Sequence, residues 1–450
     1  MILINQVKNL LQGDSRSKVV AQNIVASMGI KGISIMVTFM LVPLTIGYVS
    51  PKLYGIWLTL SSFLTWLCFL DIGLAQGLKT QLAAAIAKGE MQRGKELVST
   101  TYFMLILIFV PVCIILEWLV PFVPWCQLLN VDAHYHAEIV QVMHVLLAFA
   151  CLQMIVNALI SVIAAFQKVA LSNTFIPIGN LISLLIIYIL TKTCPPSMMA
   201  LALTLVAMPI LVVILASFIL YTGRFRSVAP SWRSVRRKLL PSIFSLGYKF
   251  FLINIQVVVV YQCTNLLIAN ISSPEDVTRY NIAYQLLGVA VMVFNIVASP
   301  LWPAFTDAYT RKDFQWMHLT RRRMIRLFGI SALLCTLIVA LSPFIYAVWI
   351  GDRVSMPFAM SVFVGIYVLA HCWQVLNSTM IVGMGKVQLH AIVAVLGMLI
   401  HIPQSLFLSQ YIGMYGVLLS VILLNLTYGV IYYIQASKLL ANTASGIWAK

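Results

Sequence analysis

Long apolar stretches recur along the whole chain, and short segments that hold most of the charged residues separate them. Most stretches reach about 20 residues or more, which is the length that crosses a bilayer as a helix. The pattern predicts about 12 spans, at residues 20–48, 54–80, 98–120, 139–165, 171–191, 199–221, 241–271, 278–305, 325–349, 358–383, 388–412 and 413–437. Helices are expected because lipid offers the backbone no hydrogen-bond partners. The strands of a membrane barrel would instead alternate in polarity over about 10 residues.

The composition is that of an all-α polytopic membrane protein rather than of a soluble domain. Of the 450 residues, 61% are hydrophobic and 9% are charged, whereas a soluble domain carries about 25% charged residues. The segment before the first span is too polar for the core of a signal peptide, so we expect that span to direct targeting and to stay in place. The 8 cysteines are scattered without a CxxC pair, which predicts neither a zinc site nor a disulfide framework.

The net charge of +17 comes from lysine and arginine residues that are unevenly placed. With the N-terminus inside, 23 of the 29 Lys and Arg residues fall in cytoplasmic segments or at their edges, as the positive-inside rule describes. We therefore predict cytoplasmic N- and C-termini. Basic runs such as residues 233–238 and 320–323 are interpreted as topological anchors that can also touch anionic lipid headgroups. A nucleic-acid partner is not expected.

The two halves of the chain share short sequence patterns. SMGIK at 27–31 returns as SLGYK at 245–249, YGIW at 54–57 as YNIA at 280–283, and AIAKGEMQ at 85–92 resembles AYTRKDFQ at 308–315. We predict an N-terminal lobe of about six helices at 1–221, a basic cytoplasmic linker at 222–240 and a C-terminal lobe of about six helices at 241–450. Two six-helix lobes in the same orientation form a parallel pseudo-repeat, whose binding site is expected between the lobes near mid-membrane.

Five longer motifs resemble a known family. They are PLTIGYVSPKLYGIW, FLDIGLAQGLKTQL, GYKFFLINI, EDVTRYNIAYQL and SPLWPAFTDAY, in this order along the chain. The chain resembles the O-antigen-type polysaccharide flippases of the multidrug/oligosaccharidyl-lipid/polysaccharide exporter superfamily from about Asn23 to beyond the eighth span. The resemblance implies a two-lobed helical transporter that moves lipid-linked oligosaccharide across the bacterial inner membrane. Membrane lipids and other polysaccharide-assembly proteins are the further partners expected, and no cofactor is expected.

Lys31 and Lys249 are the last residues of the repeated motif SMGIK/SLGYK, and each is predicted to lie about 10 Å inside an apolar span. A charge at that depth costs at least about 2.5–3.5 kcal/mol on insertion scales and marks a transport pathway by default. Polar side chains share a helix face with each lysine, namely Ser34, Thr38 and Thr45 with Lys31, and Gln256 and Cys263 with Lys249. Such polar stripes fit a water-filled cavity better than lipid.

Asp71 distinguishes the two lysines. The first two spans form a hairpin that turns near Pro51, and Lys31 and Asp71 both lie 20 residues from that point. Equal offsets in antiparallel helices mean equal depth, so these two side chains are expected to meet. The corresponding level for Lys249 carries no carboxylate, which makes Lys249 the uncompensated cation. The Lys31–Asp71 pair has two interpretations: a structural pair that fixes the hairpin, or a pair in which Asp71 couples transport to a proton or sodium ion.

An uncompensated cation in a polar cavity calls for an anion. Given the family resemblance, the candidate is the diphosphate that joins an oligosaccharide to its polyprenyl carrier, because lysine binds phosphate as a compact charge. Lys249 is predicted to bind it with Lys31 assisting, and Asn254 and Gln256 are predicted to contact sugar hydroxyls. Six further amides could do the same: Gln153, Asn157, Gln262, Asn265, Gln374 and Asn377. For all of these amides the alternative is interhelical hydrogen bonding.

Three histidines and one glutamate within predicted spans are further candidates. His371, His390 and His401 are either core residues or participants in proton coupling, and Glu117 is expected to reach the outer interface. Outside the spans, the HxH of His134 and His136 lacks a third ligand, so we interpret both as solvated loop residues and expect no metal site.

Three rival functions remain open at this point. A multidrug exporter of the same superfamily would keep the fold, but such exporters handle cations, whereas the buried carboxylate here has a lysine at its level. A lipid II flippase relative would usually have two further helices. A polysaccharide polymerase or glycosyltransferase would carry a large external loop or a catalytic domain, and no nucleophile–histidine–acid set, nucleotide-binding loop or large extramembrane segment is evident.

Overall fold

The computed structural model describes residues 15–69, 74–166, 168–239, 256, 258–298, 301, 305, 308–309, 311–386 and 388–449. Every regular element within these ranges is helical, which confirms the all-α prediction. Nine of the described helices or helix pairs are long and apolar enough to cross a membrane: Gly29–Tyr48, Met91–Phe122, Ala133–Ala165, Phe175–Thr193, Met198–Thr222, Phe314–Trp349, Phe358–Gly383, Gln388–Ile412 and Tyr415–Leu440. The other three predicted spans, 54–80, 241–271 and 278–305, each contain residues outside the description.

The chain folds into two compact units, each with its own core. Unit 1 comprises residues 1–50, 63–126 and 132–254, and unit 2 comprises residues 51–62, 127–131 and 255–450. The longer helices of unit 1 are α2 (Ser15–Tyr48), α4 (Leu74–Ala87), α5 (Met91–Leu119), α7 (His136–Val156), α8 (Ala158–Ala165), α10 (Phe175–Thr193) and α12 (Met208–Thr222). The longer helices of unit 2 are α14 (Cys263–Ile271), α15 (Pro274–Leu287), α16 (Val289–Ala298), α18 (Phe314–Trp349), α19 (Phe358–Gly383), α20 (Gln388–Ile412) and α21 (Tyr415–Leu440). The helix α3 (Pro51–Phe69) contributes its first 12 residues to unit 2.

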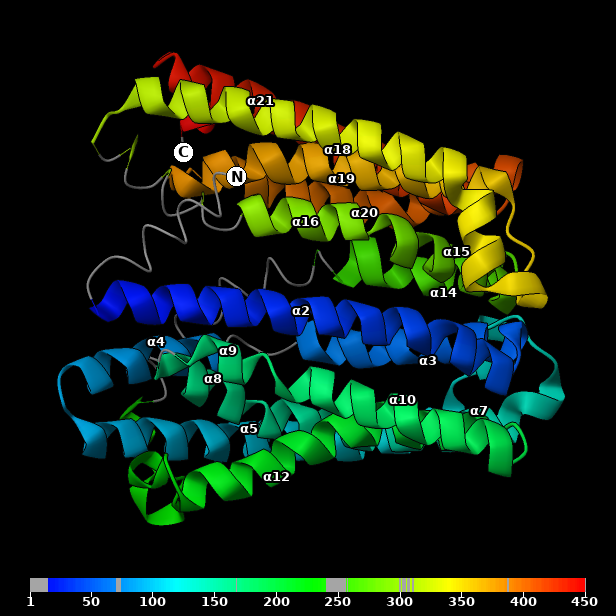
Figure 1. Ribbon diagram of the computed structural model, residues 1–450, viewed down its shortest axis with the longest axis horizontal. Helices are drawn as coiled ribbons and strands as arrows, with labels where there is room; N and C mark the ends of the chain where they lie inside the picture. The colour runs from blue at the N-terminus through cyan, green and yellow to red at the C-terminus, as the bar shows by residue number, and fades with distance from the viewer. Residues whose placement is uncertain are drawn as a thin grey trace. The chain divides into compact units, whose positions relative to one another are not determined.

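In unit 1, α10 packs against both α2 and α12, and Figure 1 shows these helices running lengthwise through the unit. The approach of α10 to α12 depends on Gly179, where an added Cβ would lie 2.3 Å from the Cα of Pro209. Pro209 cannot donate a backbone hydrogen bond, and a π-helical turn at Leu203–Ala207 directly precedes its helix. One predicted span therefore consists of α11 (Met198–Ala202), this turn and α12 rather than one regular helix.

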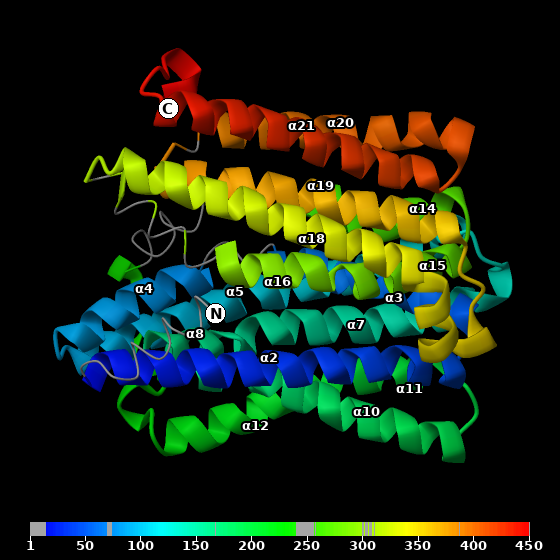
Figure 2. The same cartoon turned by 45° about the horizontal axis from the view of Figure 1, so that its top comes forward.

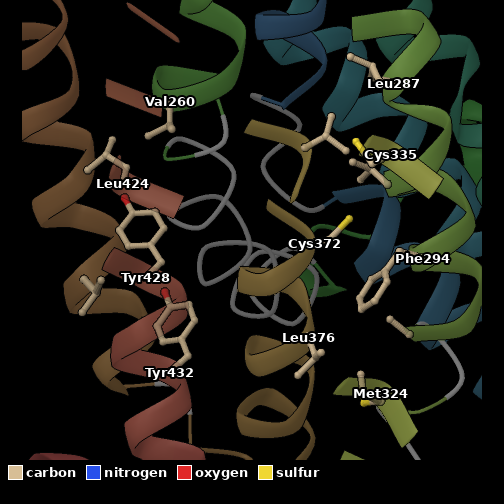
Figure 3. Packing of buried hydrophobic residues seen from close by; sticks show 14 of the residues in the cluster. Val260, Leu287, Phe294, Met324, Cys335, Cys372, Leu376, Leu424, Tyr428 and Tyr432 are labelled. Atoms are coloured by element: carbon tan, nitrogen blue, oxygen red, sulfur yellow. The ribbon is translucent and has the colours of Figure 1, made fainter. Parts of the chain in front are cut away.

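In unit 2, α19 packs against α15, α16, α18 and α21, and α21 also packs against α20. Figure 2 shows α18, α19 and α21 running side by side. Buried side chains from these helices form one core, in which Tyr428 and Tyr432 stand one turn apart on α21 (Figure 3). The outward side of α18 is apolar and uncovered: Leu333, Phe344 and Val348 are 71–74% exposed. Such a surface is stable against lipid and a liability in water.

Candidate functional site

Lys31 lies on α2 in unit 1, where its side chain is exposed. No hydrogen bond or ion pair joins it to a side chain in the described ranges. Ser34 lies one helical turn after Lys31 and is partly accessible, and Thr38 lies two turns after Lys31 and is exposed. The Thr38 hydroxyl donates to the Ser34 carbonyl at 2.8 Å. Thr45, by contrast, is buried. The polar stripe predicted around Lys31 is therefore accessible over its first two turns and closed at its far end.

Three of the predicted site residues lie outside the described part of the chain: Asp71, Lys249 and Asn254. The Lys31–Asp71 pair and the anion-binding role of Lys249 therefore stay predictions. The remaining predicted contact, Gln256, is described and buried. Its side chain lies next to the hydroxyl of Tyr428 on α21, which is a buried group with no hydrogen bond of normal geometry.

Tyr261, Asn425 and His371 form a polar cluster inside unit 2, and Tyr261 lies five residues after Gln256 along the chain. The Tyr261 hydroxyl donates to Asn425 Oδ1 at 3.0 Å, and His371 Nδ1 lies 3.2 Å from the same oxygen. The Asn425 amide donates in turn to the Val421 carbonyl at 2.8 Å. Because one amide oxygen receives two donors, His371 must carry its proton on Nδ1 in this arrangement. The cluster links the π-helical turn Val258–Gln262 with α19 and α21.

An aromatic stack extends this cluster toward α15. The ring of Tyr284 stacks between those of Tyr280 and Tyr367, with centroids 5.9 and 5.6 Å apart. Next to it on α15, Asn281 donates to Asn265 Oδ1 at 2.8 Å, and Asn265 donates to the Ser62 hydroxyl at 2.9 Å. Asn265 thus makes the interhelical hydrogen bonds that were the alternative to sugar contact.

Every side chain named in this unit 2 cluster is neutral or a histidine. Such a set can hydrogen-bond hydroxyl and amide groups, while its stacked tyrosine rings pack against one another within the core of unit 2. Asn377 does not join it, because its amide donates to the Trp373 carbonyl of its own helix. The cluster and Gln256 together are the part of the candidate site that the structure brings together.

The described spans contain three carboxylates, and each one is engaged. Glu117 contacts His144 across α5 and α7, Glu96 pairs with Arg236 at 3.2 Å, and the Glu138 carboxylate accepts from the Met198 backbone at 3.1 Å. The sequence predicted only that Glu117 reaches the outer interface. Its contact with His144 was not predicted, because a single sequence does not show which residues of different helices come together. Of the three histidines considered for proton coupling, His401 is fully buried, and its Nδ1 lies 3.1 Å from the Ser420 hydroxyl.

No family model and no curated protein sequence matches the chain. Solved structures do match along nearly its whole length. An inward-facing conformation of a multidrug resistance MATE family transporter of the MOP superfamily superposes with a TM-score of 0.79 and 11% identity, covering 93% of this chain and 98% of that one. An outward-facing conformation of such a transporter gives a TM-score of 0.65 with 15% identity, covering 97% and 98%. A MATE structure in complex with MaL6 gives 0.65 and 15%, covering 97% and 99%.

The chain has the MATE fold. MATE transporters have 12 helices in two lobes, which confirms the predicted fold class and shows a multi-pass membrane protein. At 11–15% identity the likeness extends to the fold and not to the cargo. Sequence reasoning singled out Lys31 and Gln256 as candidates but did not bring Tyr261, His371 and Asn425 together as one cluster. Their only sequence signal is the presence of polar residues in spans otherwise filled by aliphatic side chains.

Proposed function

We propose that this protein is a flippase that moves polyprenyl-diphosphate-linked oligosaccharide from the cytoplasmic to the outer face of the bacterial inner membrane. Transport would proceed by alternating access, with both termini in the cytoplasm. The observation that carries the proposal is the accessible Lys31 within a described span: no carboxylate of the described spans pairs with it, and each of those carboxylates has another partner. The predicted partner of Lys31, Asp71, lies outside the described residues. An accessible intramembrane cation favours an anionic cargo.

The roles of individual residues follow from this cargo. Lys249 would bind the diphosphate with Lys31 assisting, and Asp71 would couple binding to a proton or sodium ion. Gln256 and Asn254 would contact sugar hydroxyls. For Gln256 the support is its position beside the Tyr428 hydroxyl inside unit 2, because an amide both donates and accepts hydrogen bonds as sugar hydroxyls require.

A multidrug exporter of the same superfamily is the second candidate. It is favoured by the name of the similar structures, which belong to multidrug resistance transporters. A site for cationic drugs needs a carboxylate free to receive them, because an unpaired cation is not stable in a low-dielectric site. The described spans offer only the engaged Glu96, Glu117 and Glu138. This pairing supports the flippase over the drug exporter.

Deletion and rescue in the source bacterium separate the two functions. Loss of the gene should abolish surface polysaccharide, and a plasmid copy should restore it, because under this proposal the oligosaccharide-linked lipid carrier reaches the outer face only through the transporter. The same strains should accumulate ethidium equally. Normal surface polysaccharide in the deletion strain, or raised ethidium accumulation that the plasmid reverses, would instead support the drug exporter.

A further inference from the structure

The segment that was predicted as a linker is docked on α5 within unit 1. Phe225 and Val228 belong to the core of that unit and are almost fully buried. Two backbone amides of the segment donate to α5 side chains: Ser231 to the Ser99 hydroxyl and Arg236 to the Thr100 hydroxyl, each at 3.0 Å. Residues 223–239 are therefore an ordered part of unit 1.

A cavity of about 190 Å³ lies between α5 and this segment and is partly open to the surface. That volume is many times the roughly 10–15 Å³ that a single water needs. Its wall includes Tyr102, Phe103 and Ile106 from α5, and Trp232 and Val235 from the segment. Phe103, Ile106 and Val235 are wholly apolar, and Trp232 adds a largely apolar indole ring.

The polar groups in the cavity wall already have partners. The Ser99 hydroxyl donates to the Lys95 carbonyl at 2.7 Å and accepts from the Ser231 amide. The Tyr102 hydroxyl is 3.1 Å from the Tyr221 hydroxyl. A polar guest would find few free hydrogen-bonding groups here, whereas an alkyl chain would need none. The interior of the cavity therefore fits a hydrocarbon guest.

The depth of the cavity is that of the membrane interface. On α5, Arg93, Lys95 and Glu96 come just before the cavity residues, and an uninterrupted apolar run begins near Phe103. At its edge Trp232 is 70% exposed and its ring meets Phe103 edge to face, with centroids 6.0 Å apart. An exposed tryptophan at the start of an apolar run is typical of the headgroup region.

The segment around the cavity is strongly basic. Residues 222–239 contain six Lys and Arg residues and no Asp or Glu. The guanidinium of Arg236 is partly neutralised by Glu96 at 3.2 Å. Arg224, Arg226 and Arg233 are exposed, and within the described ranges no acidic side chain pairs with them. Arg233 follows Trp232 directly in one short 3-10 helix, so a cation stands beside the aromatic edge of the cavity.

We propose that this cavity binds an anionic phospholipid of the cytoplasmic leaflet, with an acyl chain in the cavity and the phosphate on Arg233 and its basic neighbours. The apolar walls of the cavity suit the acyl chain of such a lipid. The exposed arginines of the segment suit its phosphate. The lipid would hold residues 223–239 at the membrane surface. This inference does not depend on which cargo the protein moves.

Quenching of tryptophan fluorescence by brominated lipids tests the proposal. Purified full-length protein is placed in vesicles that contain dibrominated phosphatidylglycerol or dibrominated phosphatidylcholine, and the Trp232 signal is taken as the difference between wild type and Trp232→Phe. We expect phosphatidylglycerol to quench this signal at several-fold lower mole fraction. Arg233→Gln should lower the preference for phosphatidylglycerol over phosphatidylcholine roughly five-fold, since a basic residue near an anionic surface contributes about 1 kcal/mol.

Two comparisons keep the test independent of folding and of general basicity. Arg322→Gln, an exposed arginine on α18, should leave the preference unchanged. In native mass spectrometry, wild type should retain phosphatidylglycerol, and Ile106→Phe, which reduces the cavity, should retain less. Equal quenching by the two lipids, an equal effect of Arg322→Gln, or unchanged lipid retention in Ile106→Phe would overturn the proposal.

Discussion

Replacement of Lys249 by alanine is expected to abolish export of surface polysaccharide while the protein still inserts in the membrane. The physical reason is that a lysine predicted to lie about 10 Å inside a span is costly to insert, and the sequence predicts no carboxylate at its level that would make it structural. A charged hydrogen bond contributes about 1.5–3 kcal/mol, so loss of the diphosphate contact should reduce transport at least roughly ten-fold. Lys249→Arg keeps the charge and should retain part of the activity.

Lys88→Ala is the matched control for this experiment. Lys88 is exposed in the turn after α4, and its replacement should leave export unchanged. Lys31→Ala should reduce export by less than Lys249→Ala, because Lys31 is predicted to assist. The measurement is the amount of surface polysaccharide per cell, normalised to the amount of transporter in the membrane. Full export by Lys249→Ala at normal abundance would remove this residue from the substrate site.

Gly55→Ala is expected to destabilise unit 2 more than most single substitutions. The backbone of α3 approaches the start of α15 so closely at Gly55 that an added Cβ would lie 1.7 Å from the Pro274 carbonyl oxygen. The two helices would have to separate, which would strain the bond from the Thr278 hydroxyl to the Pro51 carbonyl, now 2.7 Å long. Overpacking of this kind costs about 1–3 kcal/mol or more. The melting temperature in detergent should fall by several degrees.

The same substitution at Gly329 provides the comparison. Gly329 lies within α18, and an added Cβ there would have no neighbour within 4 Å. Because alanine is a better helix former than glycine by about 0.5–1 kcal/mol, Gly329→Ala should leave the melting temperature unchanged or raise it slightly. If Gly55→Ala melted at the same temperature as Gly329→Ala, the close packing of α3 on α15 would be wrong.

The fold class could be predicted from the sequence because span length and polarity are properties of consecutive residues. The repeat was also visible, and the structure gives one physical reason for it: Tyr54 and Tyr280, in matching motifs, are 7% and 6% exposed. Local irregularities were harder to predict. The π-helical turn before Pro209 depends on both that proline and the approach of Gly179 on another helix.

The candidate site was less predictable because its contacts join helices far apart in sequence. Lys31 and Gln256 could be proposed as candidates because a polar residue in an apolar run is visible by itself. The bond between Tyr261 and Asn425 spans 164 residues, and nothing in either local stretch indicates the other. Asn265 was predicted as either a sugar contact or a helix–helix contact, and its bonds to Ser62 and Asn281 show that it makes the second kind.

Translocation in proteoliposomes tests the central claim most directly. Purified protein would be reconstituted with a labelled polyprenyl-diphosphate oligosaccharide, and movement between leaflets would be followed by the label's accessibility to an added impermeant reagent. We predict protein-dependent movement that Lys249→Ala abolishes and Lys88→Ala preserves, with no uptake of ethidium. Ethidium transport without movement of the lipid-linked oligosaccharide would contradict the account.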